Sequence, residues 1–378
     1  MAVTVVSSGI RILALFLRFV LLIVINKYYS TENIKIFTES LAFAAIFSGL
    51  AGAQLFYYLL REEKAPESVA YSLHKTIIYL SILALILLRL LFEIPNLYIT
   101  ITVIELLTLE ISRIYMVKKE PNMSNSIFIV PPLIYGLSVC IDMYISNDLS
   151  VITLLTLTFV VPLLFFYFRL NSVELSSIKN LSYGITIDIL KVIIPMIILQ
   201  VSNLYFLQYS KFIVLEQYND LIFIKFSNTL TLFNVVNTFL FSLFIVKQPY
   251  ILGKSRYLRR RVSCQIIGFH LIFSFFAVLI MRFLSNAFGF MVLENYQQLI
   301  LLMLITLFLL LPQILTFGFV HNGTQNRLVL SVIPGLLVML ALTGFISTDS
   351  IEFFLMILLG SVGLNYIARL ILLRFDAS

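Results

Sequence analysis

Long apolar stretches alternate with short polar connections along this chain, and their length predicts helices that cross a membrane. An α-helix needs about 20 consecutive apolar residues to span the hydrocarbon core of a bilayer. Windows of that length select twelve apolar stretches, at residues 4–26, 36–60, 76–93, 98–116, 126–146, 151–168, 186–214, 221–246, 263–290, 298–320, 328–346 and 351–373. We therefore expect an all-α polytopic membrane protein with about twelve transmembrane helices.

Basic residues are distributed unequally between the connections that join these stretches. The odd-numbered connections hold only Lys27 and Lys35, whereas the even-numbered connections and the C-terminal tail hold fifteen lysines and arginines. Because Lys and Arg are retained on the cytoplasmic side of a membrane, this bias predicts that both termini lie in the cytoplasm. The odd connections, which are then the outer ones, are four to nine residues long. That is too short for an external catalytic domain.

The composition supports the same class of protein and excludes several others. Of the 378 residues, 60% are hydrophobic and 12% charged, and the mean hydropathy is +1.02. A soluble domain carries about 25% charged residues. The net charge of +7 reflects membrane topology, so we expect no nucleic-acid partner. Two cysteines and three scattered histidines match no metal-ligand spacing. We expect no metal site, no cofactor and no enzymatic activity.

A weak internal repeat relates the two halves of the chain. At a constant offset of 190 residues, five identities align without a gap between residues 23–35 and 213–225. The offset pairs the end of the first stretch with the end of the seventh. Because six spans is an even number, both halves then have the same orientation in the membrane. This predicts two six-helix bundles, residues 1–184 and 185–378.

Two arginines interrupt the first apolar stretch. Arg11 and Arg18 are seven residues apart, so a helix places them on nearly the same face. Each charge near the centre of a membrane helix costs roughly 2.5–3.5 kcal/mol on insertion scales. A face that looks into a polar cavity explains that cost. The alternative is that the two side chains reach toward opposite interfaces, or that they form structural pairs.

The corresponding stretches of the second half also carry polar residues, which suggests two bundles that face a central polar space. The candidate lining residues are Gln200, Asn203, Gln208 and Lys211 in stretch 186–214, and Asn234 and Asn237 in stretch 221–246. Structural interpretations remain open for them. Lys211 could reach lipid headgroups, and the asparagines could form hydrogen bonds between helices.

Other charged residues in the stretches have two interpretations each. Asp188 and Lys191 form either an interfacial pair or part of the site, and Arg282 is either cavity-facing or interfacial. Glu39 and Glu105, with Asp188, are candidates for coupling to a proton or sodium gradient.

The charged residues of stretch 98–116 can also be interpreted without any coupling to an ion gradient. Glu105, Glu110 and Arg113 can compensate one another's charge, since Glu110 and Arg113 are three residues apart.

Twelve spans in two halves, short outer connections and charged residues in spans 1 and 7 resemble the MOP flippase superfamily. Within it, the chain is similar to the polysaccharide exporter branch, the Wzx-type flippases of O-antigen and capsule repeat units. The local sequence also resembles that branch, with a span 1 that ends in Asn26-Lys27-Tyr28-Tyr29-Ser30 and a span 7 that ends in Lys211 before Tyr218-Asn219-Asp220. With 378 residues, the chain is short for that branch.

This resemblance implies a lipid-linked oligosaccharide flippase of the bacterial cytoplasmic (inner) membrane. It would move undecaprenyl-pyrophosphate-linked repeat units to the outer face by alternating access, in lipopolysaccharide or capsule biosynthesis. The cations Arg11, Arg18 and Lys211 would then bind the pyrophosphate, and membrane lipids and other polysaccharide assembly proteins would be its partners. A small-molecule or drug exporter of the same superfamily and an O-antigen polymerase are the alternatives.

Overall fold

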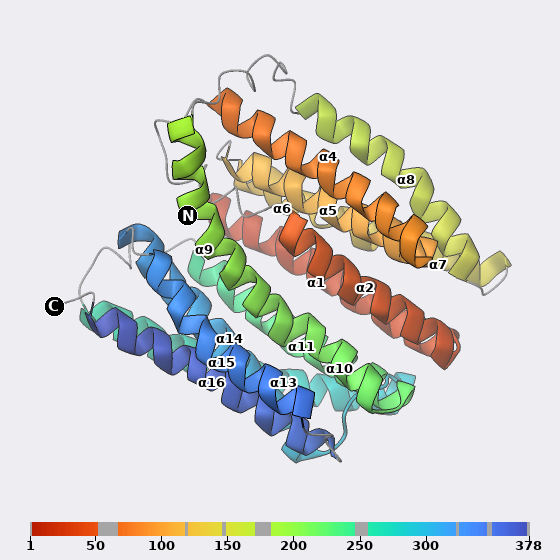
Figure 1. The fold of residues 1–378 in the computed structure, drawn as a ribbon. Coiled ribbons are helices and arrows are strands. Elements are labelled where there is room, and N and C mark those ends of the chain that lie inside the picture. Colours follow the sequence, from red (N-terminus) through yellow and green to blue (C-terminus); the bar gives the residue numbers. More distant parts are fainter. Residues whose placement is uncertain are drawn as a thin grey trace. The chain divides into compact units, whose positions relative to one another are not determined.

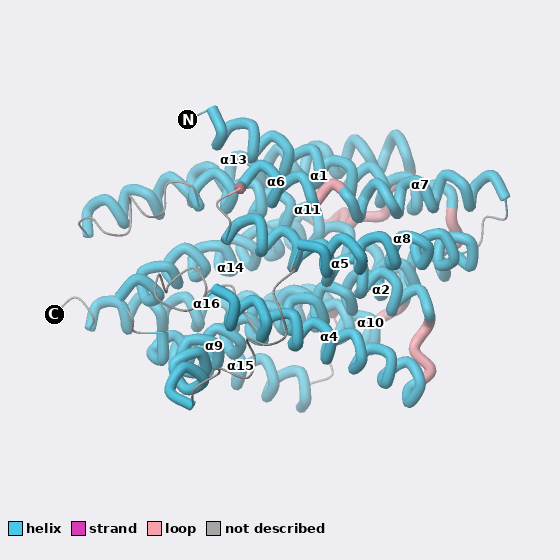
Figure 2. The backbone as a smooth tube through the Cα atoms, turned by 90° about the horizontal axis from the view of Figure 1, so that it is seen from above, coloured by secondary structure: helices cyan, strands magenta, loops and turns pink. Residues whose placement is uncertain are grey.

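A computed structural model describes residues 2–51, 67–117, 120–145, 149–170, 183–245, 256–322, 325–345 and 350–375. Within these ranges the chain is helical, without strands and with only short loops (Figure 1, Figure 2). Contacts between residues divide the chain into two compact units, Met1–Leu204 and Tyr205–Ser378. The two units are called unit 1 and unit 2 below.

Unit 1 contains eight α-helices, among those that the structure describes. They are α1 (Ala2–Tyr28), α2 (Thr31–Ala51), α4 (Glu67–Phe92), α5 (Asn96–Val117), α6 (Pro121–Ile127), α7 (Val130–Ile145), α8 (Leu149–Leu170) and α9 (Tyr183–Leu204). The core lies where α5 packs against α2, α8 and α4, and Leu107 and Ile111 of α5 are completely buried there with Tyr167 of α8.

Unit 2 begins inside a long helical segment and continues through five further helices. Its described elements are the π-helical turn η2 (Tyr205–Tyr209), α10 (Ser210–Gln217), α11 (Asp220–Ile245), α13 (Arg256–Phe288), α14 (Tyr296–Asn322), α15 (Gln325–Phe345) and α16 (Ile351–Phe375).

The predicted spans and the observed helices agree along the whole described chain. The helices form twelve consecutive segments when α6 and α7, and likewise α9, η2 and α10, are each counted as one. Six of the helices are long and apolar enough to cross a membrane over their described residues, and three more have shorter apolar stretches. The prediction of an all-α polytopic membrane protein is confirmed. The domain boundary after residue 184 stays a prediction, since the contacts group α9 with unit 1.

The fifth span is broken in a way that its apolar pattern did not predict. The α6 helix ends at Ile127, and α7 begins at Val130. The cause is the pair Pro131 and Pro132, which lack backbone N–H groups and whose rings clash with the preceding turn of a helix. The break leaves α6 as a short separate helix that contacts α1 and α5.

Two helical hairpins occupy corresponding places in the two units. In each, a two-residue linker joins the helices, residues 29–30 in unit 1 and 218–219 in unit 2. The second linker residue caps the next helix through its side chain. Ser30 Oγ accepts the N–H of Asn33 at 3.3 Å, and Asn219 Oδ1 accepts the N–H of Ile222 at 2.9 Å. The caps lie 189 residues apart, one fewer than the offset of the sequence repeat.

The helix contacts follow the same order in both units. The second span packs against the fourth, the fourth against the sixth, and the fifth against the sixth, as α2·α5, α5·α8 and α7·α8 in unit 1 and α11·α14, α14·α16 and α15·α16 in unit 2. This shared order supports the internal repeat.

Candidate functional site

Arg18 of α1 forms an ion pair with Glu105 of α5. Its Nη2 atom lies 2.8 Å from Oε1 and 2.7 Å from Oε2 of the carboxylate. The hydroxyl of Tyr135, on α7, donates a longer hydrogen bond of 3.4 Å to Oε1 of Glu105. The ring of Phe37 packs edge-on against that of Tyr135, at 6.4 Å between centroids. Three helices of unit 1, α1, α5 and α7, therefore meet at this carboxylate, and α2 packs against Tyr135 through Phe37.

Arg11 has polar and aromatic neighbours but no carboxylate. Its Nη1 donates a long hydrogen bond of 3.5 Å to Oδ1 of Asn125 on α6, and its guanidinium lies 4.8 Å from the centroid of the Phe128 ring. No ion pair involves Arg11 within the described ranges. Asn125 lies in the last turn of α6, and Phe128 is the residue that follows its end. Among the described residues, Arg18 therefore has a carboxylate counter-ion and Arg11 has none.

Both arginines lie on the packed face of α1. Ala14, Leu21 and Ile25 are buried at positions that alternate with Arg11 and Arg18 in steps of three and four residues. Of the predicted alternatives, structural pairing describes Arg18, whose side chain is nevertheless 38% exposed. Whether either arginine faces a substrate cavity stays a prediction.

The remaining acidic candidates of unit 1 have protein partners. Glu39 of α2 accepts a short hydrogen bond from the hydroxyl of Tyr98, and Glu110 pairs with Arg113 at 2.5 Å. The predicted compensation of Glu110 by Arg113 is confirmed. Glu105 instead compensates Arg18, which lies 87 residues away and which no local pattern on span 4 could reveal.

The buried Lys211 lies in α10, two residues after the π-helical turn η2. This lysine is 5% exposed, and it forms no ion pair among the residues that the structure describes. Three buried oxygens lie on the same hairpin without a hydrogen-bond partner: Gln208 Oε1, Ser210 Oγ and Ser227 Oγ. Ser210 of α10 and Ser227 of α11 are equally far along the chain from the linker 218–219, so the hairpin places them at about the same height along its two helices. π-Helical turns are rare and are frequent at functional sites.

The other predicted residues of spans 7 and 8 are placed differently from one another. Gln200 reaches α2, where its Nε2 would lie 3.2 Å from a Cβ added to Gly49. Asn203 and Asn234 are half-buried, and Lys191 is exposed. Asn237 donates a hydrogen bond of 2.8 Å to the backbone oxygen of Thr306, which is the interhelical contact predicted as its alternative. The side chain of Asp188 lies outside the described residues.

Arg282 is exposed near the end of α13. Its guanidinium lies 4.0 Å from the ring centroid of Tyr296, at the start of α14. Tyr and Arg together at the end of a membrane helix are typical of the interface with lipid headgroups. This favours the interfacial interpretation of Arg282 over the cavity-facing one.

Two buried polar residues of unit 2 were not singled out by the sequence analysis. Arg369 of α16 is 1% exposed and donates from Nε to Ser331 Oγ of α15 at 3.1 Å. His270 of α13 is fully buried, with Nε2 at 3.1 Å from the backbone oxygen of Met303. Spacing could have identified Arg369, because Ser361, Asn365 and Arg369 recur every four residues along one face of span 12.

Asp142 was also missed. This residue of α7 is completely buried and accepts a short hydrogen bond from the hydroxyl of Tyr29, in the linker between α1 and α2. Burial and the neighbouring Asp142 raise the pKa of Tyr29, so the hydroxyl stays protonated and the contact persists. The pair fastens the first hairpin to α7.

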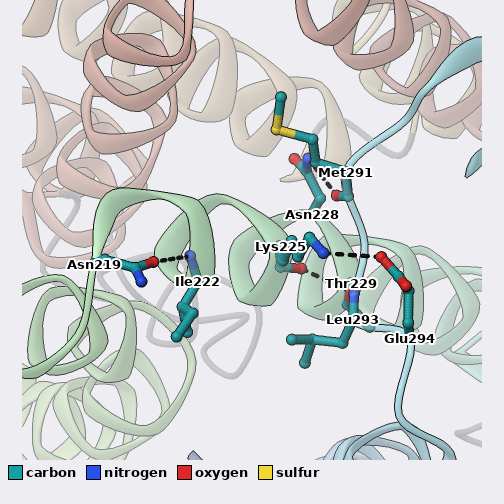
Figure 3. A network of polar contacts seen from close by, with 8 residues as sticks. All are labelled: Asn219, Ile222, Lys225, Asn228, Thr229, Met291, Leu293 and Glu294. Atoms are coloured by element: carbon teal, nitrogen blue, oxygen red, sulfur yellow. Dashed lines mark hydrogen bonds and ion pairs between the residues drawn. The ribbon is translucent and has the colours of Figure 1, made fainter.

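One face of α11 holds the loop between α13 and α14 (Figure 3). Lys225 pairs with Glu294 at 2.8 Å, Asn228 donates to the backbone oxygen of Met291 at 2.9 Å, and Thr229 Oγ1 accepts the N–H of Leu293 at 3.0 Å. The ammonium of Lys225 lowers the pKa of the Glu294 carboxyl. These contacts are structural, and they restrain a predicted outer loop.

No group of three or more metal-ligating side chains lies together in the part of the chain that the structure describes.

Comparisons with known proteins identify the fold. The chain is similar to a MOP superfamily transporter from Pyrococcus furiosus, with a TM-score of 0.56 over 98% of this chain and 93% of that one, at 13% sequence identity. The chain has the fold of a MOP superfamily transporter. It is a multi-pass membrane protein. No protein-family model matches the sequence, and no curated protein matches it significantly.

At 13% sequence identity, the similarity shows a shared fold but does not identify the substrate. The P. furiosus transporter is itself described as having a binding pocket of reverse polarity that suggests a different function. The substrate of this chain must therefore be argued from its own side chains.

Proposed function

We propose that this protein is a transporter of anionic lipids, and more specifically a flippase. Its substrate is a polyprenyl-pyrophosphate-linked oligosaccharide, such as an O-antigen or capsule repeat unit. It moves this lipid from the cytoplasmic to the outer face of a bacterial inner membrane. The observation that carries the proposal is a pair of cations in apolar helices, Arg11 and Lys211, which no described carboxylate neutralises.

A cation without a counter-ion in an apolar helix is costly, so its retention favours a ligand that supplies the negative charge. Arg11 and Lys211 are each packed within their own unit, and neither is exposed at a helix end as Arg282 is. A transporter of neutral or cationic small molecules has no use for such charges. This is the physical argument against the drug-exporter alternative.

The chemistry of the two cations suits a pyrophosphate. Arginine binds phosphate oxygens with a planar fork of donors and keeps its proton, and lysine acts as a compact point charge. On the same hairpin as Lys211, the unpartnered oxygens of Gln208, Ser210 and Ser227 could bind polar groups of the substrate. Polar oxygens that lack a partner in the protein favour a polar ligand, because an unsatisfied buried group costs about 1–3 kcal/mol.

Alternating access is the transport mode that we propose, by movement of the two halves of the internal repeat. The polyprenyl chain remains in the lipid while the charged headgroup follows the protein interior. Glu39, Glu105 and Asp188 stay the candidates for coupling to an ion gradient. Tyr98 donates a hydrogen bond to Glu39, and Arg18 pairs with Glu105.

A deletion strain tests the proposal against a polymerase. We expect lipid-linked repeat units to accumulate on the cytoplasmic face of the membrane, and plasmid-borne protein to restore export. Arg11→Gln and Lys211→Gln should each fail to restore it. Arg89→Gln is the matched control, since Arg89 is a half-buried arginine of an apolar helix that bonds Asn96 among the described residues.

Two results would reject the proposal. One is single, unpolymerised units on the outer face of the deletion strain, which would indicate a polymerase. The other is full export by both the Arg11→Gln and the Lys211→Gln variants at normal protein levels.

A further inference from the structure

The ion pair between Arg18 and Glu105 uses only part of the hydrogen-bonding capacity of the arginine. Both carboxylate oxygens lie within 2.8 Å of the same Nη2 atom. A guanidinium has five N–H donors in a fork, so Nη1 and Nε of Arg18 are not engaged by Glu105. The Arg18 side chain is also 38% exposed, whereas that of Glu105 is 16% exposed. Arg18 is the accessible partner, and Glu105 is the enclosed one.

Without Arg18, Glu105 would keep only a weak partner. The hydroxyl of Tyr135 lies 3.4 Å from Oε1 and also 3.5 Å from the backbone oxygen of Ile101, so its proton is shared between two long contacts. The Glu105 side chain is 16% exposed, so a carboxylate that has lost Arg18 as its counter-ion cannot become fully hydrated there. The physical outcome is protonation, because a neutral carboxyl group is far less costly to bury than an anion.

We propose that Glu105 is an exchangeable counter-anion of Arg18. An anionic headgroup, a pyrophosphate diester, takes the place of the Glu105 carboxylate on the Arg18 guanidinium. The released carboxylate then takes up one proton from the buffered solvent, so that an O–H bond forms on Glu105 and the group becomes neutral. No other covalent bond changes, and the site gains the charge of the headgroup together with that of one proton. This inference rests on the proposed function, and it names how the same site is regulated.

The exchange has a mechanical consequence. The Arg18–Glu105 pair joins α1 to α5, and α1 otherwise packs mainly on α6 and α7. Replacement of Glu105 by a ligand removes the direct polar link between α1 and the core helix of unit 1. Ligand binding thereby frees α1 to move relative to α5.

The exchange also has a consequence for pH dependence. Because the anion and the proton bind to the same exchanged state, each must strengthen the binding of the other, and the two effects are equal. The affinity for a pyrophosphate diester should therefore rise as the pH falls. One exchanged proton limits the rise to about tenfold for each pH unit.

Titratable groups also lie on the neighbouring helices. They include Arg11 on α1, which has no carboxylate partner among the described residues, Glu39 with Tyr98, Glu110 with Arg113, Tyr135 on α7, Asp142 with Tyr29, and Arg89 with Asn96. Arg11 is the one that shares a face of α1 with Arg18, and its charge is fixed over the physiological range. Glu105 is the group whose partner the ligand removes.

Proton uptake by the wild-type chain is the direct test. The full-length protein in lipid nanodiscs is mixed, in weakly buffered solution near pH 7.5, with undecaprenyl pyrophosphate that carries one sugar. This ligand is a diester whose charge does not change in that range. We expect uptake of up to one proton for each bound ligand. The Glu105→Gln variant should bind the ligand at least tenfold more tightly at pH 8 and take up no proton.

The outcomes separate the exchange from the proposed function. Binding without proton uptake by the wild-type protein overturns the exchange and leaves the flippase proposal intact. Absence of binding at every pH, for the wild-type protein and the variant, overturns the flippase proposal itself. If Glu105→Gln does not fold, Glu105→Asp replaces it, and the wild-type proton measurement still decides. An unchanged affinity and pH dependence in a folded Glu105→Gln variant shows that the pair is only structural.

Discussion

Replacement of Gly335 by alanine should separate α15 from α16 and destabilise unit 2. A Cβ atom at this position would lie 2.2 Å from the backbone oxygen of Ser361 and 2.4 Å from Oδ1 of Asn365. An ordinary carbon–oxygen contact is about 3.3 Å or longer, so the helices must move apart by about 1 Å. The Ser361 oxygen belongs to the backbone, and it cannot turn away as a side chain could. Only a shift of the helix relieves the clash.

The change in the free energy of unfolding follows from two destabilising contributions and one stabilising contribution. Overpacking of this kind costs about 1–3 kcal/mol. The hydrogen bond from the N–H of Gly335 to Asn365 Oδ1, 2.9 Å long, would also be strained, and such a bond contributes about 0.5–1.5 kcal/mol. Alanine returns up to about 1 kcal/mol through its higher helix propensity. We expect a net loss of about 2 kcal/mol in the free energy of unfolding.

A second glycine provides the matched control. A Cβ on Gly363 of α16 meets nothing within 4 Å, so Gly363→Ala should be neutral or stabilise by up to about 1 kcal/mol. The assay is unfolding of purified protein by SDS in mixed micelles, followed by circular dichroism. If Gly335→Ala and Gly363→Ala unfold at the same SDS fraction, the close approach of α15 and α16 is wrong.

Three further predictions concern the outer loop and the broken helix. Asn228→Ala should speed hydrogen exchange in the loop 289–295 and cost about 1 kcal/mol, because a loop carbonyl loses its donor; unchanged exchange would contradict the contact. Since Lys225 lowers the pKa of Glu294 below its usual 4.5, their ion pair stabilises the loop above that pH and is lost as the pH falls through the lowered value. Hydrogen exchange in the loop 289–295 should therefore be faster in Glu294→Gln than in the wild type near neutral pH, and the two should be equal only at low pH. Replacement of both Pro131 and Pro132 by alanine should join α6 to α7 and raise the helix content measured by circular dichroism, unless the break has another cause.

The apolar pattern was sufficient to predict the twelve helical segments, because a membrane span is defined by its own length and composition. The hairpin linkers could also have been predicted from the sequence, since Ser30 and Asn219 are ordinary capping residues. The break before α7 could have been predicted from Pro131 and Pro132. It was missed because a hydropathy window averages over two prolines.

The polar contacts were harder to predict than the helices. Arg18 and Glu105 are 87 residues apart, and nothing in either local sequence indicates the other. The sequence analysis instead grouped Glu105 with Glu110 and Arg113 of its own helix, and of that group only Glu110 and Arg113 pair. The same applies to Tyr29 and Asp142. Such pairs depend on how whole helices pack, and a single sequence does not contain that information in local form.

The central claim is that unneutralised cations bind and move an anionic lipid headgroup. The most direct measurement is the initial rate at which purified protein in vesicles exposes a fluorescent, sugar-linked undecaprenyl pyrophosphate to the opposite leaflet. We predict transfer well above that of protein-free vesicles, and a loss of at least tenfold in Arg11→Gln, since one charge-assisted hydrogen bond is worth about 1.5–3 kcal/mol. Equal rates for the wild type, Arg11→Gln and protein-free vesicles would contradict the account.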